Sequence, residues 1–119
     1  MPEILVSLDG LAAEPVARGL RAGGWEVDLA APDDVDDGSL RGARALVVGE
    51  PVLDDRTLLR SVAGELATRA RQAGVPCHAV TNRNRLDRFA ARILDLQAIV
   101  EGSSEAELEA AGRALAPLI

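Results

Sequence analysis

The sequence predicts a single α/β domain in which helices cover both faces of a parallel five-stranded sheet. Short apolar runs rich in branched residues alternate along the chain with segments whose apolar residues recur at helical spacing. Such alternation is typical of parallel strands joined by right-handed helical crossovers. The length of 119 residues suits one domain with one core, and no internal repeat or linker divides residues 1–119.

The first half of the chain provides two strands and one helix. The run EILVSL at residues 3–8 predicts a buried strand that ends at Asp9. Residues 11–21 follow as a helix with a glycine exit, and WEVDLA at residues 25–30 alternates as a second strand. The segment APDDVDDGSLRG at residues 31–42 is acidic and rich in turn formers, so we expect a long connection with one short helical turn at most.

The middle of the chain provides the third and fourth strands and the longest helix. ARALVVGE at residues 43–50 predicts the third strand, and residues 54–72 predict a single helix with an apolar side, followed by Gly74 as its exit. VPCHAVT at residues 75–81 predicts the fourth strand.

The last elements complete the alternation. We expect a helix over residues 86–93, a short strand LQAIV at residues 96–100, and a final helix that starts at Glu105. Ser104 and Glu107 have the spacing of a capping box at the start of this last helix. The predicted architecture is therefore a three-layer, doubly wound sheet of Rossmann or flavodoxin-like type, with a strand order such as 2-1-3-4-5.

Composition excludes several classes of function. The net charge of −6 argues against binding nucleic acid, which requires clustered cations, and Trp25 and Phe89 are the only aromatic residues. All 13 basic residues are arginine, so a Walker-type lysine, a Schiff base and a lysine general base are excluded. Cys77 is alone, so no internal disulfide or cysteine-based zinc site is expected.

The expected location is the cytoplasm. No apolar run approaches the roughly 20 residues that span a bilayer. The start, MPEILVSLDG, has neither a basic region nor a long apolar region of the kind found in signal peptides. We therefore expect an intracellular protein without a membrane partner.

In a doubly wound sheet, ligands bind at the carboxyl ends of the strands, near the point where the strand order reverses. The predicted strands deliver Asp9, Gly10, Gly49, Glu50, Thr81, Asn82 and Arg83 to that edge. A site, if the protein has one, is expected there. Arg83 is of interest because a guanidinium at a strand end can bind a carboxylate or phosphate.

The segment VVGEPVLDDRTL after the third strand is the most informative local pattern. Gly49 permits close approach of the backbone, and Pro51 shapes the turn. Asp54 is in position to cap the helix by accepting from the amide of Arg56 or Thr57. The remaining first-turn amides could then attract an anion. Capping and direct ligand contact both remain open for Asp54.

The same segment resembles the bacterial glycerate kinases of the first class, whose signature runs T-G-E-G, then L-D, Q-T and G-K. The matching residues are Gly49, Glu50, Leu53, Asp54 and Thr57. ARQAGVPCHAVTNR is also similar to the family's next passage, with Arg83 in the place of its arginine, and Asp9 matches the aspartate of the opening D-S-F-K-G. The resemblance is specific over residues 45–83. It implies one lobe of a kinase that binds ATP and magnesium between two lobes.

Several signature positions differ from the family. Val48, Pro51, Arg56, Arg60 and Ser61 replace the family's threonine, second glycine, glutamine and G-K pair, and the opening lysine is absent. The chain resembles the first lobe with the inserted second lobe missing, and phosphoryl transfer needs both substrates held in line and shielded from water. These departures favour a domain without kinase activity by itself that binds a small anionic ligand or a protein partner at the strand edge.

The alternatives are an active or two-chain glycerate kinase, and a receiver-like or homo-oligomeric assembly module. The catalytic candidates for the kinase are Glu50 and Asp54. The candidate ligand-binding residues are Asp9, Gly49, Glu50, Asp54, Thr57, Asn82 and Arg83. A receiver would need a lysine after its last strand, and the chain has none.

The other polar residues have simpler structural explanations. Asp33, Asp34, Asp36 and Asp37 lack the spacing of an EF-hand and are expected to form a solvated loop, so no metal site is predicted. A lone histidine in a strand, His78, is expected to be structural, and Cys77 is expected to pack in the core. For Arg83, Arg85 and Arg88, anion binding and pairing with nearby aspartates remain equally open.

Overall fold

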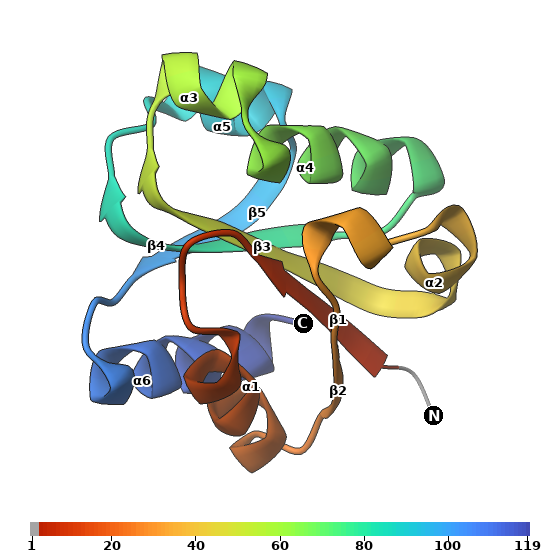
Figure 1. The fold of residues 1–119 in the computed structure, drawn as a ribbon, viewed down its shortest axis with the longest axis vertical. Coiled ribbons are helices and arrows are strands. Elements are labelled where there is room, and N and C mark those ends of the chain that lie inside the picture. The colour runs from red at the N-terminus through yellow and green to blue at the C-terminus, as the bar shows by residue number, and fades with distance from the viewer. Residues whose placement is uncertain (1–2) are drawn as a thin grey trace.

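The computed structural model describes residues 3–119, with the exception of the side chains of residues 57–59. It confirms five parallel strands in the order β2-β1-β3-β4-β5. The strands are β1 (Glu3–Leu8), β2 (Glu26–Leu29), β3 (Ala43–Leu53), β4 (Cys77–Asn84) and β5 (Leu96–Glu101), and Figure 1 shows the twisted sheet that they form. Parallel pairing follows from the helical connections, because each returns the chain to the same end of the sheet.

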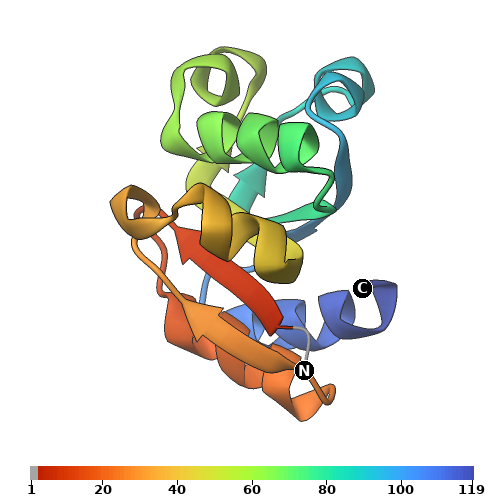
Figure 2. The same ribbon diagram turned by 90° about the vertical axis from the view of Figure 1, so that its right-hand side faces the viewer.

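Helices cover both faces of the sheet, as predicted. The helices α1 (Ala13–Ala22) and α6 (Glu105–Leu115) lie on one face, as Figures 1 and 2 show. The other face carries α2 (Asp37–Gly42), α3 (Asp55–Arg60), α4 (Val62–Ala73) and α5 (Arg88–Ile93). Two 3-10 turns, η1 (Pro32–Asp34) and η2 (Ala116–Leu118), complete the elements. The fold is therefore three-layered.

The core consists of two apolar clusters separated by the sheet. Successive strand residues point to opposite faces, so Val6, Val47 and Val80 pack against α1 and α6. Their neighbours Leu5 and Val48 pack against α2 and α4. Burying each such side chain contributes roughly 1.5–3 kcal/mol. The central strands β1, β3 and β4 are thus fixed from both sides, which positions their carboxyl ends.

The connection over residues 31–42 is more helical than predicted, and that prediction is corrected. It contains η1 and a full α-helix, α2. The Asp36 side chain accepts a hydrogen bond from the amide of Ser39 at 2.7 Å, which caps α2, and Leu40 is buried in the core. One cap and one buried leucine are sufficient to hold this short helix, although its two glycines favour a loop.

The single helix predicted over residues 54–72 is wrong, because the chain forms two helices. α3 ends at Arg60, and Ser61 begins α4 by accepting from the amide of Gly64 at 3.3 Å. The third strand also extends beyond its predicted end at Glu50. Val52 and Leu53 pair with the fourth strand, so β3 continues to Leu53.

The predicted helix ends are confirmed where local chemistry determines them. Ser104 and Glu107 form the capping box of α6, in which each side chain accepts from the other residue's amide at about 3 Å. Gly74 ends α4 in the left-handed region, with φ of 73°. Asp87 caps α5 by accepting from the amide of Ala90 at 2.8 Å.

Glycines allow α1 and α6 to pack in direct backbone contact. A Cβ added to Gly112 would lie 2.2 Å from the carbonyl oxygen of Val16, and one added to Gly19 would lie 2.1 Å from that of Glu109. These distances are far below ordinary van der Waals contact, so only glycine permits this approach. This contact, centred in the second half of each helix, holds α1 against α6 on one face of the sheet.

Over residues 3–119, none of the helices combines the length and the apolar character needed to cross a bilayer.

Candidate ligand-binding site

The carboxyl ends of β1, β3 and β4 meet at the point where the strand order reverses. The chain leaves β1 toward β2 on one side, and β3 lies on the other side. The amide of Asp9, just after β1, donates to the carbonyl of Gly49 in β3 at 2.9 Å. The Thr81 hydroxyl in β4 donates to the carbonyl of Glu50 at 2.7 Å. These contacts fix the edge at which doubly wound folds bind ligands.

The Glu50 carboxylate makes a structural hydrogen bond inside the protein. Its side chain is 6% exposed and lies on the face covered by α4. Oε1 accepts a hydrogen bond from the amide of Ala63 at 3.1 Å, in the first turn of α4. A carboxylate is favoured there by the unpaired amides and the positive end of the helix. Glu50 therefore caps α4 together with Ser61, and its carboxylate is directed into the protein.

Gly49 lies on the opposite face of the sheet from Glu50. A Cβ added to Gly49 would lie 2.2 Å from the carbonyl oxygen of Val80 and about 3.1 Å from the Leu8 and Leu11 side chains. The glycine is therefore required by close packing under the β1–α1 loop. The adjacent residues Gly49 and Glu50 contact different layers of the protein.

The other predicted residues are spread along the edge. Asp54 directly precedes α3 and is half-buried, and the Thr57 side chain lies outside the described residues. Arg83 is exposed, whereas Asn82 is half-buried on the side of α1 and α6, where its Nδ2 donates to the carbonyl of Gly102 at 2.8 Å. The structure thus separates Asn82 from Glu50 and Arg83 across the sheet.

A hollow of about 580 Å³ opens at the start of α1 and α6, and we call it the α1 hollow. It is open to solvent and is bordered by the β1–α1 loop, the first turns of both helices and the end of β4. Its lining residues are Gly10, Leu11, Ala12, Glu14, Pro15, Arg18, Asn82, Ser103, Glu105 and Leu108. Its volume falls within the range of roughly 300–1,000 Å³ that is usual for small-molecule sites.

The β1–α1 loop leaves the start of α1 without a side-chain cap. Gly10 has a φ of 76° and packs against Pro51, which turns the chain sharply out of β1. Ala12 occupies the N-cap position and makes no side-chain hydrogen bond. The first-turn amides of Ala13 and Glu14 therefore have no acceptor from the N-cap side chain, and the third position, whose amide Ser104 caps in α6, is Pro15, which has no amide. Glu14 lies at the wall of the α1 hollow, whereas Ala13 packs against the core cluster under α1.

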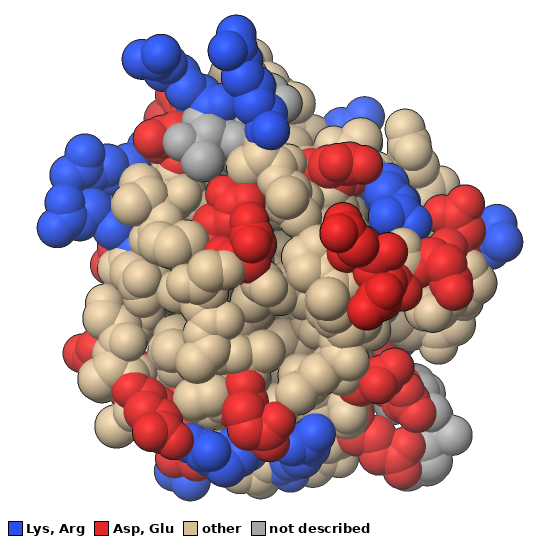
Figure 3. Space-filling model, in the orientation of Figure 1, with Lys and Arg blue, Asp and Glu red and all other residues tan. Residues whose placement is uncertain are grey.

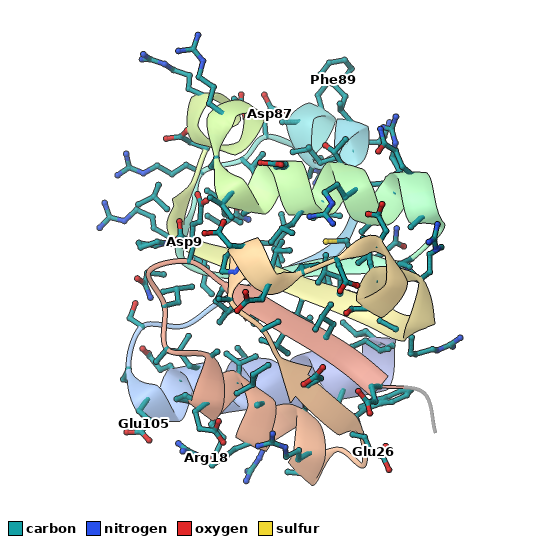
Figure 4. The ribbon with its side chains drawn as sticks, turned by 45° about the vertical axis from the view of Figure 1, so that its right-hand side comes forward. Asp9, Arg18, Glu26, Asp87, Phe89 and Glu105 are labelled. Carbon is teal, nitrogen blue, oxygen red and sulfur yellow. The ribbon has the colours of Figure 1, made fainter. Side chains whose placement is uncertain are left out.

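Charges around the α1 hollow are balanced by ion pairs. Arg18 donates to Glu105 at 2.6 Å and to Glu109 at 3.3 Å, and Figure 4 shows Arg18 and Glu105 on neighbouring helices. The hydrogen bond to Glu105 raises the pKa of Arg18. Glu14 pairs with Arg21 at 3.0 Å. The carboxylates at the rim are thus partly neutralised, which reduces their repulsion of an anionic ligand.

Cys77 and His78 lie at the opposite end of the sheet, at the start of β4. Both are buried, and burial raises the pKa of the Cys77 thiol to about 12. Burial lowers the pKa of His78, whose Nδ1 has no hydrogen-bond partner within residues 3–119. Among the described side chains, no three His, Cys, Asp or Glu residues are arranged to hold a metal ion.

Sequence reasoning predicted the edge but missed most residues of the α1 hollow. Of the predicted ligand-binding residues, Asn82 lines it, and Gly10 next to Asp9 does so too. Ala12 and Ser103 were not predicted. One signal was present in the sequence: the segment Leu11-Ala12-Ala13 has no Ser, Thr, Asp or Asn to cap the helix that follows it.

Comparison with known proteins identifies the fold. No known family of sequences matches the chain, and no curated protein matches it. An archaeal flavodoxin is similar in structure, with a TM-score of 0.61, 12% identity and coverage of 98% of this chain and 97% of the flavodoxin. A response regulator from Burkholderia multivorans has a TM-score of 0.59 and 18% identity, over 99% of this chain and 95% of the regulator.

The flavodiiron protein of Giardia intestinalis contains a similar domain. It has a TM-score of 0.59 and 15% identity, and the match covers 98% of this chain but 35% of the longer flavodiiron chain. Together with the strand order, these similarities show that the chain has the flavodoxin-like fold.

Proposed function

We propose that this chain is a flavodoxin-like binding domain that takes a small anionic metabolite in the α1 hollow and has no kinase activity by itself. The observation that carries the proposal is the uncapped first turn of α1 at the wall of a ligand-sized hollow, at the carboxyl edge of the sheet. Open α/β sheets bind ligands at this edge, and uncapped helix starts attract anions.

The expected ligand is small and carries a phosphate or carboxylate. The amide of Glu14 can donate to its oxygens, and the helix end contributes about 0.3–1 kcal/mol at an exposed position and up to about 2 kcal/mol when partly buried. The side chain of Asn82 and the Ser103 hydroxyl add neutral polar contacts at the same wall. A few such contacts support weak binding, so millimolar ligand is the appropriate starting concentration.

The roles of the kinase-like residues support the non-catalytic part of the proposal. In the resemblance to glycerate kinases, Glu50 is a candidate for catalysis, but here its buried carboxylate holds the start of α4. Gly49 is explained by packing against Val80 and Leu8. If kinase activity is nevertheless retained, ATP consumption will depend on both glycerate and magnesium, and its absence at high protein concentration removes the kinase alternative.

A receiver-like signalling module is the second candidate. The similarity in fold to a response regulator favours it, and Asp9 follows β1 while Glu50 and Thr81 lie in the paired strands β3 and β4, three residues before each strand ends. In this case Glu50 would have to accept a phosphoryl group, for which its carboxylate would have to leave Ala63 and become exposed. Incubation with acetyl phosphate and magnesium, followed by mass spectrometry of the intact protein, tests this candidate. A gain of one phosphoryl group that Glu50→Gln abolishes supports it, and an unchanged mass counts against it.

The anion-binding proposal is tested by thermal unfolding with inorganic phosphate, glycerate, phosphoglycerate, or ATP with magnesium. Binding to the folded state raises Tm, by an amount that grows with the ratio of ligand concentration to Kd. Phosphate also stabilises proteins by exclusion from their surface. The informative quantity is therefore the difference between the wild type and a variant in which the site is blocked.

In the variant Ala12→Asp, a carboxylate of the protein itself occupies the proposed anion site. The new carboxylate can accept from the amide of Glu14, since Pro15 at the third helical position has no amide, so without ligand the variant should be more stable than the wild type by up to about 1 kcal/mol. It should also lose the response to every anion. Ala12→Asn is the matched control, because it caps α1 without the charge and should show a weaker loss. Equal anion responses in the wild type and Ala12→Asp would overturn the proposal.

A further inference from the structure

The helix α5 presents apolar side chains to solvent and buries none of its residues. Phe89 is 73% exposed and Ile93 is 47% exposed. They are four residues apart, so they lie on one face of the helix, and Figure 4 shows Phe89 directed away from the protein. An aromatic side chain that is left in water beside a second apolar residue is typical of an interaction surface.

Three arginines, Arg85, Arg88 and Arg92, accompany these apolar side chains. All three are exposed, and within the described part of the chain none of them forms an ion pair. The paired arginines are elsewhere: Arg18, Arg21, Arg69 and Arg113. We call Arg85, Arg88, Phe89, Arg92 and Ile93 the α5 surface. Arginine with an aromatic anchor is the composition that protein interfaces favour.

A second hollow, of about 230 Å³, lies between α2 and the amino ends of β1 and β2. We call it the α2 hollow. Its walls include Leu5 and three small residues, Gly38, Gly42 and Ala43, which keep it open. A Cβ added to Gly42 would meet nothing within 4 Å. A cavity of roughly 150 Å³ already accommodates benzene, so the α2 hollow has room for the ring of a phenylalanine.

The α2 hollow carries the charge opposite to that of the α5 surface. Glu3 and Asp28 line it, and Asp33 and Asp34 are exposed in η1, which precedes α2. These four carboxylates form no ion pair with any residue of the described chain. Figure 3 shows acidic side chains gathered on the right, over η1 and α2. Each surface thus has an excess of unpaired charge of one sign, which Arg41 in α2 and Asp87 at the start of α5 reduce but do not reverse.

We propose that the protein associates head to tail, with Phe89 of one copy inserted in the α2 hollow of the next. The arginines of the α5 surface then face Glu3 and Asp28 of the neighbouring copy. A symmetric contact between two α5 surfaces would instead place arginine against arginine. Because the two contacting patches differ, the association is heterologous and leads to a ring or a growing chain. This self-association is independent of anion binding in the α1 hollow.

Sedimentation velocity from micromolar to millimolar protein tests the association directly. At low salt the sedimentation coefficient should rise with concentration, and added salt should reverse the rise, because the screening length falls from about 8 Å at physiological ionic strength to about 3 Å at 1 M. A wild type that stays monomeric at millimolar concentration and low salt overturns the proposal.

Two variants then test the two surfaces separately. Phe89→Asp removes the anchor but leaves the α2 hollow intact, and Gly42→Arg fills the hollow but leaves Phe89 intact. Each should be monomeric alone, and their mixture should form a dimer with one copy of each. Leu118→Asp is the control, because it removes an exposed apolar side chain elsewhere and should associate as the wild type does.

Circular dichroism confirms that each variant is folded before its association is compared. If Phe89→Asp is monomeric while folded Gly42→Arg still associates, the α5 surface binds another site and the proposed contact is wrong. If both variants are folded and monomeric but the mixture does not dimerise, the head-to-tail arrangement is overturned.

Discussion

Replacing Gly112 with alanine tests the backbone contact that holds α1 against α6 beside the α1 hollow. The new Cβ would lie 2.2 Å from the carbonyl oxygen of Val16, whereas ordinary contact begins at about 3.4 Å. The helices must therefore separate by about 1.2 Å, the difference between these two distances. The atom met is backbone, so it cannot move aside as a flexible side chain could.

The expected loss of stability follows from two opposing contributions. Overpacking costs typically about 1–3 kcal/mol, and alanine gains up to about 1 kcal/mol over glycine in a helix interior. The contact with Val16 is severe, so we expect a net loss of about 1–2 kcal/mol. For a domain of this size that loss lowers Tm by roughly 4 °C per kcal/mol. Urea denaturation gives the free energy, and thermal circular dichroism gives Tm.

Gly42→Ala is the matched control for this experiment. Its Cβ enters open space at the end of α2, so stability should be unchanged or slightly higher. The double variant Gly19→Ala/Gly112→Ala should lose less than the sum of the two single variants, because the helices separate only once. A Gly112→Ala protein as stable as the wild type would refute the close backbone contact between Gly112 of α6 and Val16 of α1.

Three further predictions concern buried polar groups. Glu50→Ala leaves the amide of Ala63 without its acceptor and should cost about 1–3 kcal/mol in urea denaturation, whereas Glu50→Gln should retain much of the stability. Burial lowers the pKa of His78, so as the pH drops the unfolded chain binds a proton at this residue before the folded protein does. The free energy of unfolding should therefore fall as the pH drops below about 6.5. In urea denaturation, His78→Leu should make this fall shallower. Burial raises the pKa of Cys77 to about 12, so a thiol reagent at mildly alkaline pH should label it only on unfolding, and rapid labelling of the native protein would contradict its burial.

The fold could be predicted from the sequence because periodicity and turn chemistry are local. The strands at residues 3–8 and 43–50 are apolar runs between turn formers, and the capping box of α6 can be recognised from Ser104 and Glu107 in the sequence. The break at Ser61 was missed because the apolar spacing of Val62, Leu66 and Ala70 continues that of the preceding segment. Periodicity shows which side of a helix is buried, but it does not show where one helix stops and another starts in the same phase.

The candidate site was predicted only as an edge, because its details depend on contacts between distant segments. Gly49 and Glu50 are adjacent in sequence, yet the pleat of β3 directs them to opposite faces. The amide that Glu50 accepts from belongs to Ala63, thirteen residues later, in a helix whose start was not predicted. The α1 hollow requires α1 and α6 to pack side by side, which no local pattern in either segment specifies.

The most direct test of anion binding in the α1 hollow is an amide NMR titration of the wild type with inorganic phosphate, compared with Ala12→Asp. The proposal predicts that the amide signal of Glu14 shifts with saturation in the wild type and stays unchanged in the variant. It is contradicted if this signal does not respond in the wild type, or if it responds equally in both proteins.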